Sequence, residues 1–269
     1  MIVFDIETGP LPWHELSQIV APFDEEKAVP HPGEFNAASV ALGNLKDEAK
    51  IQAKIDEARG KHAIELKSVA HRRAAARNDY VAKCMERAAL SAMTGTVKAI
   101  GIRDSEQSPN IVIAVDPQKE EDVEGAVGVH SFFLRYYKDE KRVLRAFWDY
   151  YANHRGQYVG HNIFGFDLPF LIRRSWILGE QIPGDLMNGR YFSGRFIDTM
   201  ERWNCTARDY VKLADISKAF GGQDKPDDCS GADFARLFDN GGEDRMKALA
   251  YLANDLEMTQ FIAESMGII

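Results

Sequence analysis

One segment constrains the fold of this chain more than any other. Residues 46–90 contain no proline and a single glycine, Gly60, and Ala, Glu, Lys and Arg dominate. Because these residues are strong helix formers, the segment predicts one long helix, or two helices bent near Gly60. Its apolar residues, such as Ile51, Ile55 and Val69, form only a thin stripe. A thin stripe buries little area, so we expect a helical arm rather than a core helix.

The rest of the chain alternates between strand and helix patterns. Apolar or alternating runs predict strands over 1–6, 96–104, 110–116, 129–133 and 157–162. Helical spacing is found over 140–153, 167–178, 213–220 and 245–266. The proline-rich stretch 10–43 is expected to be irregular, and a turn is expected over 105–109. This order indicates an α/β fold with a mixed sheet flanked by helices. A length of 269 residues suits a single domain, 1–269, with segment 46–90 inserted in it.

The overall charge is acidic but uneven. The formal net charge is -8, and segment 46–90 holds eleven Lys and Arg residues against seven Asp and Glu, a local charge of +4 that leaves -12 elsewhere. An acidic balance argues against a protein that coats nucleic acid by charge alone, because such binding requires Lys and Arg to neutralise phosphates. It does not exclude an enzyme that cuts nucleic acid.

Neither the cysteines nor the hydropathy pattern points to a special compartment. Cys84, Cys205 and Cys229 are far apart and lack the spacing of a zinc site or a disulfide framework. No stretch approaches the roughly 18 consecutive apolar residues that a membrane span needs, and the N-terminus lacks a signal-peptide pattern. We therefore expect a cytoplasmic protein that is not inserted in a membrane.

Three short patterns carry carboxylates that suit metal chemistry. Asp5 and Glu7 are two residues apart at the end of the first predicted strand, so both point to one face. Asp167 follows a predicted strand and loop, where it is either a metal ligand or a helix N-cap. Tyr251 and Asp255 are four residues apart on a predicted helix and share a face. Taken singly, each pattern also fits a solvated or capping carboxylate.

The order and context of these patterns resemble a known family. The carrying motifs are FDIET (4–8), GHNIFGFDLPFL (160–171) and YLANDLEMT (251–259). They resemble the tyrosine-bearing branch of the DEDD superfamily of 3′-to-5′ exonucleases, which has the ribonuclease-H-like fold. The chain is most similar to stand-alone exonucleases related to the proofreading domain of family-B DNA polymerases. The resemblance covers 1–9 and about 94–266, so segment 46–90 lies outside it.

The resemblance implies a metal-dependent catalytic site. Position by position, it implies that Asp5, Glu7, Asp167 and Asp255 bind two divalent ions, Mg²⁺ or Mn²⁺, for which carboxylate oxygens are suitable ligands. The resemblance also implies that Tyr251 orients the attacking water. The metal ions are expected to do most of the deprotonation, because a phenol with an ordinary pKa of about 10 is a poor base at neutral pH.

Further residues are assigned weaker roles by the same alignment. Thr8, Asn162 and Phe166 align with positions near the terminal nucleotide, although a core role for Phe166 is equally open. Asp198, in the motif FIDTM, could bind a metal ion as a carboxylate at the end of a strand, but the resemblance implies a structural role or a contact with the metal ligands instead. Neither His154 nor His161 is expected to be the general base.

The predicted arm carries a basic cluster, His71, Arg72, Arg73 and Arg77. One hypothesis is that this cluster guides single-stranded nucleic acid through phosphate contacts. The arm could instead be merely solvated, or it could offer a surface for self-association or a protein partner.

These observations predict a 3′-to-5′ exonuclease that releases nucleoside monophosphates from single-stranded or frayed 3′ ends, most simply of DNA. An exoribonuclease on the same fold is the alternative within the enzyme class, because no sensor of the 2′-hydroxyl can be read from the sequence. From different classes, the sequence also leaves open a non-catalytic relative that binds nucleic acid or a protein, and an unrelated α/β scaffold.

Overall fold

The computed structural model describes residues 1–104, 109–127, 129–205, 207, 209–223 and 229–268. The chain divides into two compact units. The first, which we call the sheet unit, comprises Met1–Pro12 and Arg87–Ile269, and the second, which we call the arm unit, comprises Trp13–Glu86. Each unit is described by itself below.

The sheet unit is built on a mixed seven-stranded sheet with strand order β4-β5-β3-β2-β1-β6-β9. Its strands are β1 (Ile2–Pro10), β2 (Gly95–Arg103), β3 (Asn110–Val115), β4 (Asp122–Val127), β5 (His130–Tyr137), β6 (Tyr158–Gly160) and β9 (Phe196–Asp198). The three strands β1, β6 and β9 are parallel to one another, whereas β2 is antiparallel to β1. A separate hairpin consists of β7 (Met187–Asn188) and β8 (Tyr191–Phe192).

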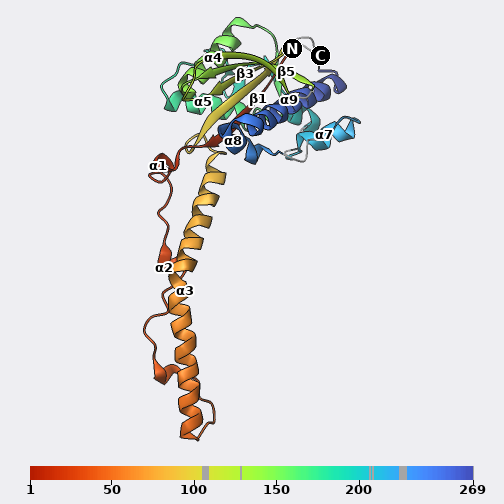
Figure 1. The fold of residues 1–269 in the computed structure, drawn as a ribbon. Coiled ribbons are helices and arrows are strands. Elements are labelled where there is room, and N and C mark those ends of the chain that lie inside the picture. Colours follow the sequence, from red (N-terminus) through yellow and green to blue (C-terminus); the bar gives the residue numbers. More distant parts are fainter. Residues whose placement is uncertain (105–108, 128, 206, 208, 224–228, 269) are drawn as a thin grey trace. The chain divides into compact units, whose positions relative to one another are not determined.

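Helices cover both faces of this sheet (Figure 1). They are α4 (Glu140–Asn153), α5 (Asp167–Ile177), α6 (Thr199–Asn204), α7 (Leu213–Ala219), α8 (Gly231–Asn240) and α9 (Gly242–Ser265). In the hydrophobic core, α4 and α5 pack on the face that carries Phe4 and Ile6 of β1. On the opposite face, α8 and α9 pack against side chains such as Ala99 and Val112. Because side chains alternate along a strand, Asp5 and Glu7 point to this second face.

One edge of β1 becomes free where β6 ends. β6 pairs with β1 only through Tyr158 and Val159, which lie beside Ile2 and Val3. A Cβ placed on Gly160 would lie 2.9 Å from the carbonyl oxygen of Phe4, so only glycine permits this close approach. From this point the chain leaves the sheet and returns as α5, which leaves the following amides of β1 available to side chains.

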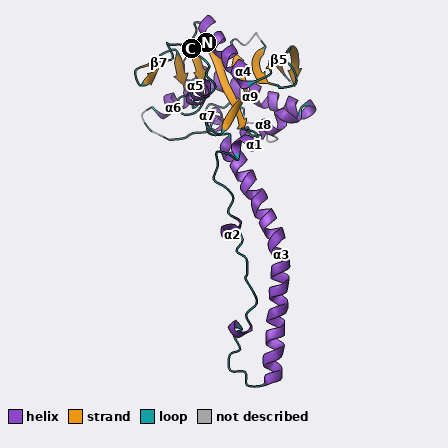
Figure 2. Ribbon diagram, turned by 90° about the vertical axis from the view of Figure 1, so that its left-hand side faces the viewer, coloured by secondary structure: helices purple, strands orange, loops and turns teal. Residues whose placement is uncertain are grey.

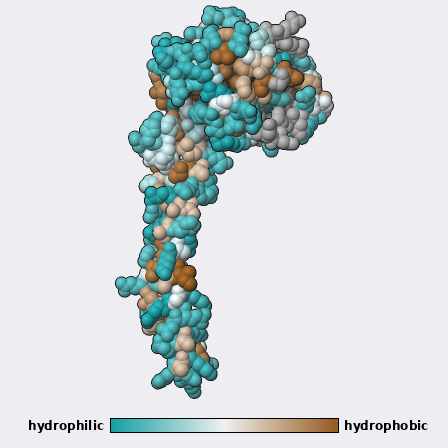
Figure 3. Space-filling model, in the orientation of Figure 1, coloured by the Kyte–Doolittle hydropathy of each residue, from teal (hydrophilic) through white to brown (hydrophobic). Residues whose placement is uncertain are grey.

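The arm unit consists of one helix and an extended segment beside it (Figure 2). α3 (Glu48–Ala88) runs through Gly60 without interruption. The segment before it contains only the short helices α1 (Trp13–Leu16) and α2 (Glu25–Ala28) and the 3-10 turn η1 (Ala37–Ser39). Phe23 packs on Tyr80, and Phe35 packs on His62. The face of this unit that Figure 3 shows is mainly hydrophilic, with small hydrophobic patches.

The predicted α/β class with a mixed sheet and flanking helices is confirmed. The long elements lie close to their predicted positions, whereas β4, α6 and α8 were not predicted. Most of the turn predicted over 105–109 lies outside the described residues. Within the described chain, no helix combines the length and the apolar character that crossing a lipid bilayer requires.

Candidate active site

Asp5 and Glu7 lie on the same face of β1, toward α8 and α9. Across the antiparallel pair they face Gly101 and Ala99 of β2, which carry no side chain and a single methyl group. The register between the two strands shifts directly after Glu7. Such an irregularity bends a strand and redirects its side chains, and it is frequent beside active sites.

The absence of a side chain at Gly101 allows α9 to approach the sheet closely. A Cβ at Gly101 would lie 2.9 Å from both Cγ and Cδ1 of Leu252. Leu252 is fully buried at this contact, and Asp255 follows it by three residues on the same helix. The close packing at Gly101 therefore places Asp255 next to Asp5, the residue opposite Gly101 in the sheet.

The structure brings Asp5, Glu7 and Asp255 together. Each offers a carboxylate oxygen, and these oxygens lie within 4.8 Å of one another. Glu7 and Asp255 are each only 6% exposed, and Asp5 is half-buried. Three like charges at this separation repel one another strongly in a buried site unless a cation or protons are present. Hard oxygen donors in this number fit Mg²⁺ or Mn²⁺.

Tyr251 borders this carboxylate cluster from one turn earlier on α9. Its side chain is buried, and a Cβ at Gly231 of α8 would lie 3.5 Å from its hydroxyl oxygen. Burial, followed by the negative charges of the three carboxylates, raises the pKa of the Tyr251 phenol. The phenol is consequently neutral at physiological pH and can act as a hydrogen-bonding group but not as a base.

Asp167 lies beside the cluster but is not part of it. Its Oδ1 accepts a hydrogen bond of 3.1 Å from the backbone amide of Ile6, between Asp5 and Glu7 in the sequence. This amide is available because β6 ends before reaching it. Burial raises the pKa of the Asp167 carboxyl to about 7, although the Ile6 amide lowers it. The residue capping α5 is Phe166, without a side-chain hydrogen bond, so Asp167 is not the N-cap.

Asp198 organises the loop that leads to Asp167. It is 2% exposed, and its carboxylate accepts hydrogen bonds from four backbone amides. Two of them belong to Asn162 and Phe164, and two to Met200 and Glu201 at the start of α6. Asn162 has a φ of 60°, a left-handed conformation that Asn adopts more readily than most residues. These contacts agree with the structural role expected for Asp198.

The two histidines have structural contacts as well. The ring of His161 lies 2.9 Å from the hydroxyl oxygen of Thr199 and 2.8 Å from the carbonyl oxygen of Val211. His154 stacks on Tyr150 and contacts its carbonyl oxygen. Both ring nitrogens of His161 are therefore engaged, and neither histidine belongs to the carboxylate cluster of the described residues.

The aligned nucleotide-binding residues have mixed positions. The Thr8 hydroxyl donates a hydrogen bond of 2.7 Å to the carbonyl oxygen of Ala89. Phe166 is half-buried, contacts Phe170 and packs against the core, as in the core role considered for it. The side chain of Asn162 lies over Gly165, where an added Cβ would lie 2.3 Å from its Oδ1.

Sequence reasoning missed the glycines that border the site. Gly101 lies inside a strand pattern and Gly231 lies at the start of an unpredicted helix. A glycine within a strand pattern is a known sign that another backbone or helix approaches closely, so Gly101 was recognisable in principle.

The basic cluster on the arm is largely neutralised by its own unit. Arg73 forms ion pairs with Glu25 and Glu26 of α2, and Arg77 pairs with Glu25. Arg73 also donates a hydrogen bond of 3.0 Å to the carbonyl oxygen of Val29. Arg72 lies 3.7 Å from Glu65. The contacts of Arg73 and Arg77 favour a role in holding the extended segment against α3 over the guiding of nucleic acid.

Comparisons with known proteins show which superfamily the chain belongs to. A search of curated proteins gave no match. Among solved structures, the chain is similar to the family B DNA polymerase from the hyperthermophilic archaeon Pyrobaculum calidifontis, with 19% sequence identity and a TM-score of 0.49. The match covers 66% of this chain but only 22% of the polymerase. A family model, RNase_H_2, described as RNase_H superfamily, matches residues 90–265, which confirms the expected ribonuclease-H-like fold. The chain belongs to the RNase_H superfamily.

Proposed function

We propose that this protein is a divalent-metal-dependent 3′-to-5′ exonuclease that acts on single-stranded or frayed 3′ ends. Membership of the RNase_H superfamily supports a nuclease-type activity in general. The observation that carries the finer proposal is the meeting of Asp5, Glu7 and Asp255, with Tyr251 beside them, where β1 and α9 pack together. The sheet unit is the proposed catalytic domain, and the arm unit is the proposed insertion in it.

Asp5, Glu7 and Asp255 are the residues that would hold the ions, with Asp167 as the proposed fourth ligand. Two bound dications would activate a water, hold the scissile phosphate and stabilise the departing 3′ oxygen. The hydrogen bond from Ile6 fixes the orientation of Asp167 beside the three other carboxylates. Without cations these carboxylates repel a phosphate, so activity requires divalent ions.

Tyr251 would position the attacking water. Its raised pKa keeps the phenolic proton in place, so the hydroxyl can donate a hydrogen bond or accept one without removing a proton from water. A buried, fixed hydroxyl beside the ligands holds a water in one orientation, which lowers the entropic part of the barrier. The carboxylates of the site would stabilise the positive charge of the bound ions.

DNA is the proposed substrate, and an exoribonuclease is the alternative. The site contains no described group whose position requires or excludes a 2′-hydroxyl. Matched DNA and RNA oligonucleotides, single-stranded, duplex and mismatched at the 3′ end, separate these cases.

The test of the proposal is cleavage by purified wild type and by Asp5→Ala and Asp255→Asn variants, with product analysis. We expect wild type to release nucleoside monophosphates from the 3′ end with Mg²⁺ or Mn²⁺, and EDTA to stop it. Both variants should lose activity while keeping the circular dichroism spectrum of wild type. Glu264→Gln, a change of an exposed carboxylate on the same helix, should remain active. Degradation from the 5′ end, or full activity of either aspartate variant, would contradict the proposal.

A further inference from the structure

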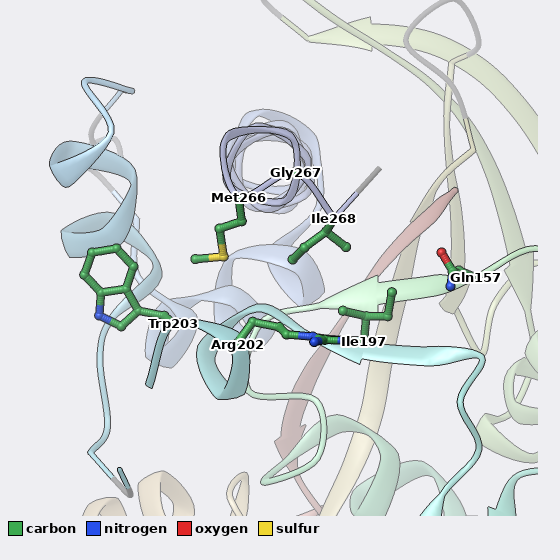
Figure 4. A pocket seen from close by; sticks show the side chains of 7 residues that line it. All are labelled: Gln157, Ile197, Arg202, Trp203, Met266, Gly267 and Ile268. Atoms are coloured by element: carbon green, nitrogen blue, oxygen red, sulfur yellow. The ribbon is translucent and has the colours of Figure 1, made fainter. Parts of the chain in front are cut away.

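An open pocket of about 510 Å³ lies in the sheet unit (Figure 4), and none of its lining residues belongs to the carboxylate cluster. Met266 and Ile268 lie on one side of it and Arg202 and Ile197 on the other, with Trp203 at one end and Gln157 at the opposite end. Met266 directly follows α9, eleven residues after Asp255. At about 1.5 Å per helical residue, the pocket lies roughly 16 Å further along the helix axis.

The pocket has an aromatic wall that is held in place. Trp203 is 40% exposed, and its ring packs edge-on against Phe220 with centroids 5.7 Å apart and an interplanar angle of 79°. A partly exposed indole that contacts a second aromatic ring can offer a stacking surface to a base. The side chains of Ile197, Met266 and Ile268 add an apolar lining.

The pocket also has an available positive charge. Arg202 forms no ion pair with the residues that the structure describes, whereas Arg195, Arg174 and Arg245 of the same unit all pair with carboxylates. Such a guanidinium beside an indole combines a phosphate-binding group with a base-stacking group. The Gln157 amide at the opposite end can donate and accept hydrogen bonds.

Arg202 links this pocket to the loop of the candidate active site. It also lines a second hollow of about 360 Å³, whose other lining residues include Phe164 and Asp198. Asp198 binds the backbone amide of Phe164, in the loop that ends at Asp167. The two hollows therefore share Ile197 and Arg202, and their linings include Phe164 of the site loop and Trp203.

From this arrangement we propose that the Trp203 pocket binds a nucleotide of single-stranded nucleic acid, upstream of the 3′ end held at the carboxylates. The base stacks on Trp203 against the apolar lining, and Arg202 contacts a phosphate. The proposal rests on the proposed exonuclease function for the identity of the strand. An apolar peptide could contact the apolar side chains of the pocket, but it would offer no anionic group to Arg202.

The test measures binding separately from cleavage. Fluorescence anisotropy is recorded for 3′-ended oligothymidylates of about two and about twelve nucleotides. The protein is the full chain carrying Asp255→Asn in the presence of Mg²⁺, so that the oligonucleotides stay intact. Trp203→Ala and Arg202→Ala are added separately. Trp176→Ala and Arg145→Ala, which change other exposed residues of the sheet unit, are the matched controls.

We expect Trp203→Ala to weaken binding of the longer oligonucleotide about fivefold or more. Arg202→Ala should weaken it as well and reduce the slope of log affinity against log salt concentration by about 0.7. Neither change should affect the shorter oligonucleotide, which reaches only the carboxylates, and the controls should bind both like the parent.

Unchanged affinity of both pocket variants for the longer strand would overturn the proposal. This result is expected if the pocket binds a protein partner instead. Equal weakening for both lengths would overturn it too, because the effect would then arise at the carboxylate site. Cleavage by wild type is measured in parallel. Length-dependent loss of binding without any cleavage would contradict the exonuclease function while supporting the pocket, so the two failures are distinguishable.

Discussion

Gly101 and Leu252 are in direct contact because Gly101 has no side chain: a Cβ there would lie 2.9 Å from Cγ of Leu252. The contact lies between β2 and α9, opposite Asp5 in the sheet and three residues before Asp255 on the helix. Gly101, which contributes no catalytic group, therefore sets the separation between the candidate ligands Asp5 and Asp255.

Gly101→Ala adds only one methyl group, but we expect it to lower both the stability of the protein and the rate of cleavage. The methyl group must displace Leu252, and overpacking of this kind costs about 1–3 kcal/mol of stability. Because the displacement moves α9, we expect cleavage to fall even at temperatures where the variant is folded. Thermal unfolding and cleavage rates at saturating Mn²⁺ check this. Gly60→Ala in α3, where an added Cβ meets no atom within 4 Å, is the control and should keep full activity.

Tyr251→Phe should lower kcat on the order of tenfold to a hundredfold through loss of the positioned hydroxyl, with little change in KM. Since the raised pKa keeps the phenol protonated, it does not titrate in the range of an assay. Wild type and variant should therefore show rate profiles of the same shape up to about pH 10. An alkaline limb present in wild type and lost in the variant would show that the tyrosine ionises during catalysis.

The raised pKa of Asp167 predicts a pH dependence of stability in EDTA. A carboxyl whose pKa is about 7 when folded and lower when unfolded contributes stability that is present at acidic pH and lost as the pH rises through about 7. Asp167→Asn should flatten this decline, whose slope is at most about 1.4 kcal/mol per pH unit. Chemical denaturation from pH 4 to pH 8 measures it.

Divalent ions provide the control for this prediction. If Asp167 is a ligand, saturating Mg²⁺ favours its ionised form and removes the decline in wild type. A decline that persists unchanged in Mg²⁺ would exclude Asp167 as a ligand and leave it as a structural partner of Ile6.

Asp198→Ala should destabilise the sheet unit by at least about 2 kcal/mol, because buried amides of the site loop and of α6 would lose their acceptor. The loop that presents Asp167 would lose its anchor, so cleavage should fall too. Asp139→Ala is the matched control: this exposed N-cap of α4 accepts one hydrogen bond, from Arg142, and its loss should cost about 1 kcal/mol. Equal losses for the two variants would contradict the anchoring role.

The sequence allowed the clustered carboxylates on β1 and the long elements to be predicted, because both depend on local patterns. The Asp5 and Glu7 pair follows from strand alternation, and α4 follows from helical spacing. The position of Asp167 could not be predicted, because its bond to Ile6 depends on where β6 ends. Likewise, the ion pairs of Arg73 with α2 join segments that are far apart in the sequence. The local sequence of the basic cluster therefore could not show that its charges are paired.

Removal of the arm unit tests the proposal that it is an insertion. β1 and β2 are antiparallel neighbours whose ends pair at Pro10 and Gly95, and the amide of Leu11 bonds to the carbonyl of Thr94. A short glycine-containing linker in place of 13–86 would join Pro12 to Arg87 and would keep residues 87–94, which lead into β2. We expect this variant to fold cooperatively and to cleave short single-stranded oligonucleotides at a rate within a few-fold of wild type. Loss of the cooperative unfolding transition would show that the sheet unit requires the arm. A folded variant without activity would show that the arm contributes to substrate binding or catalysis.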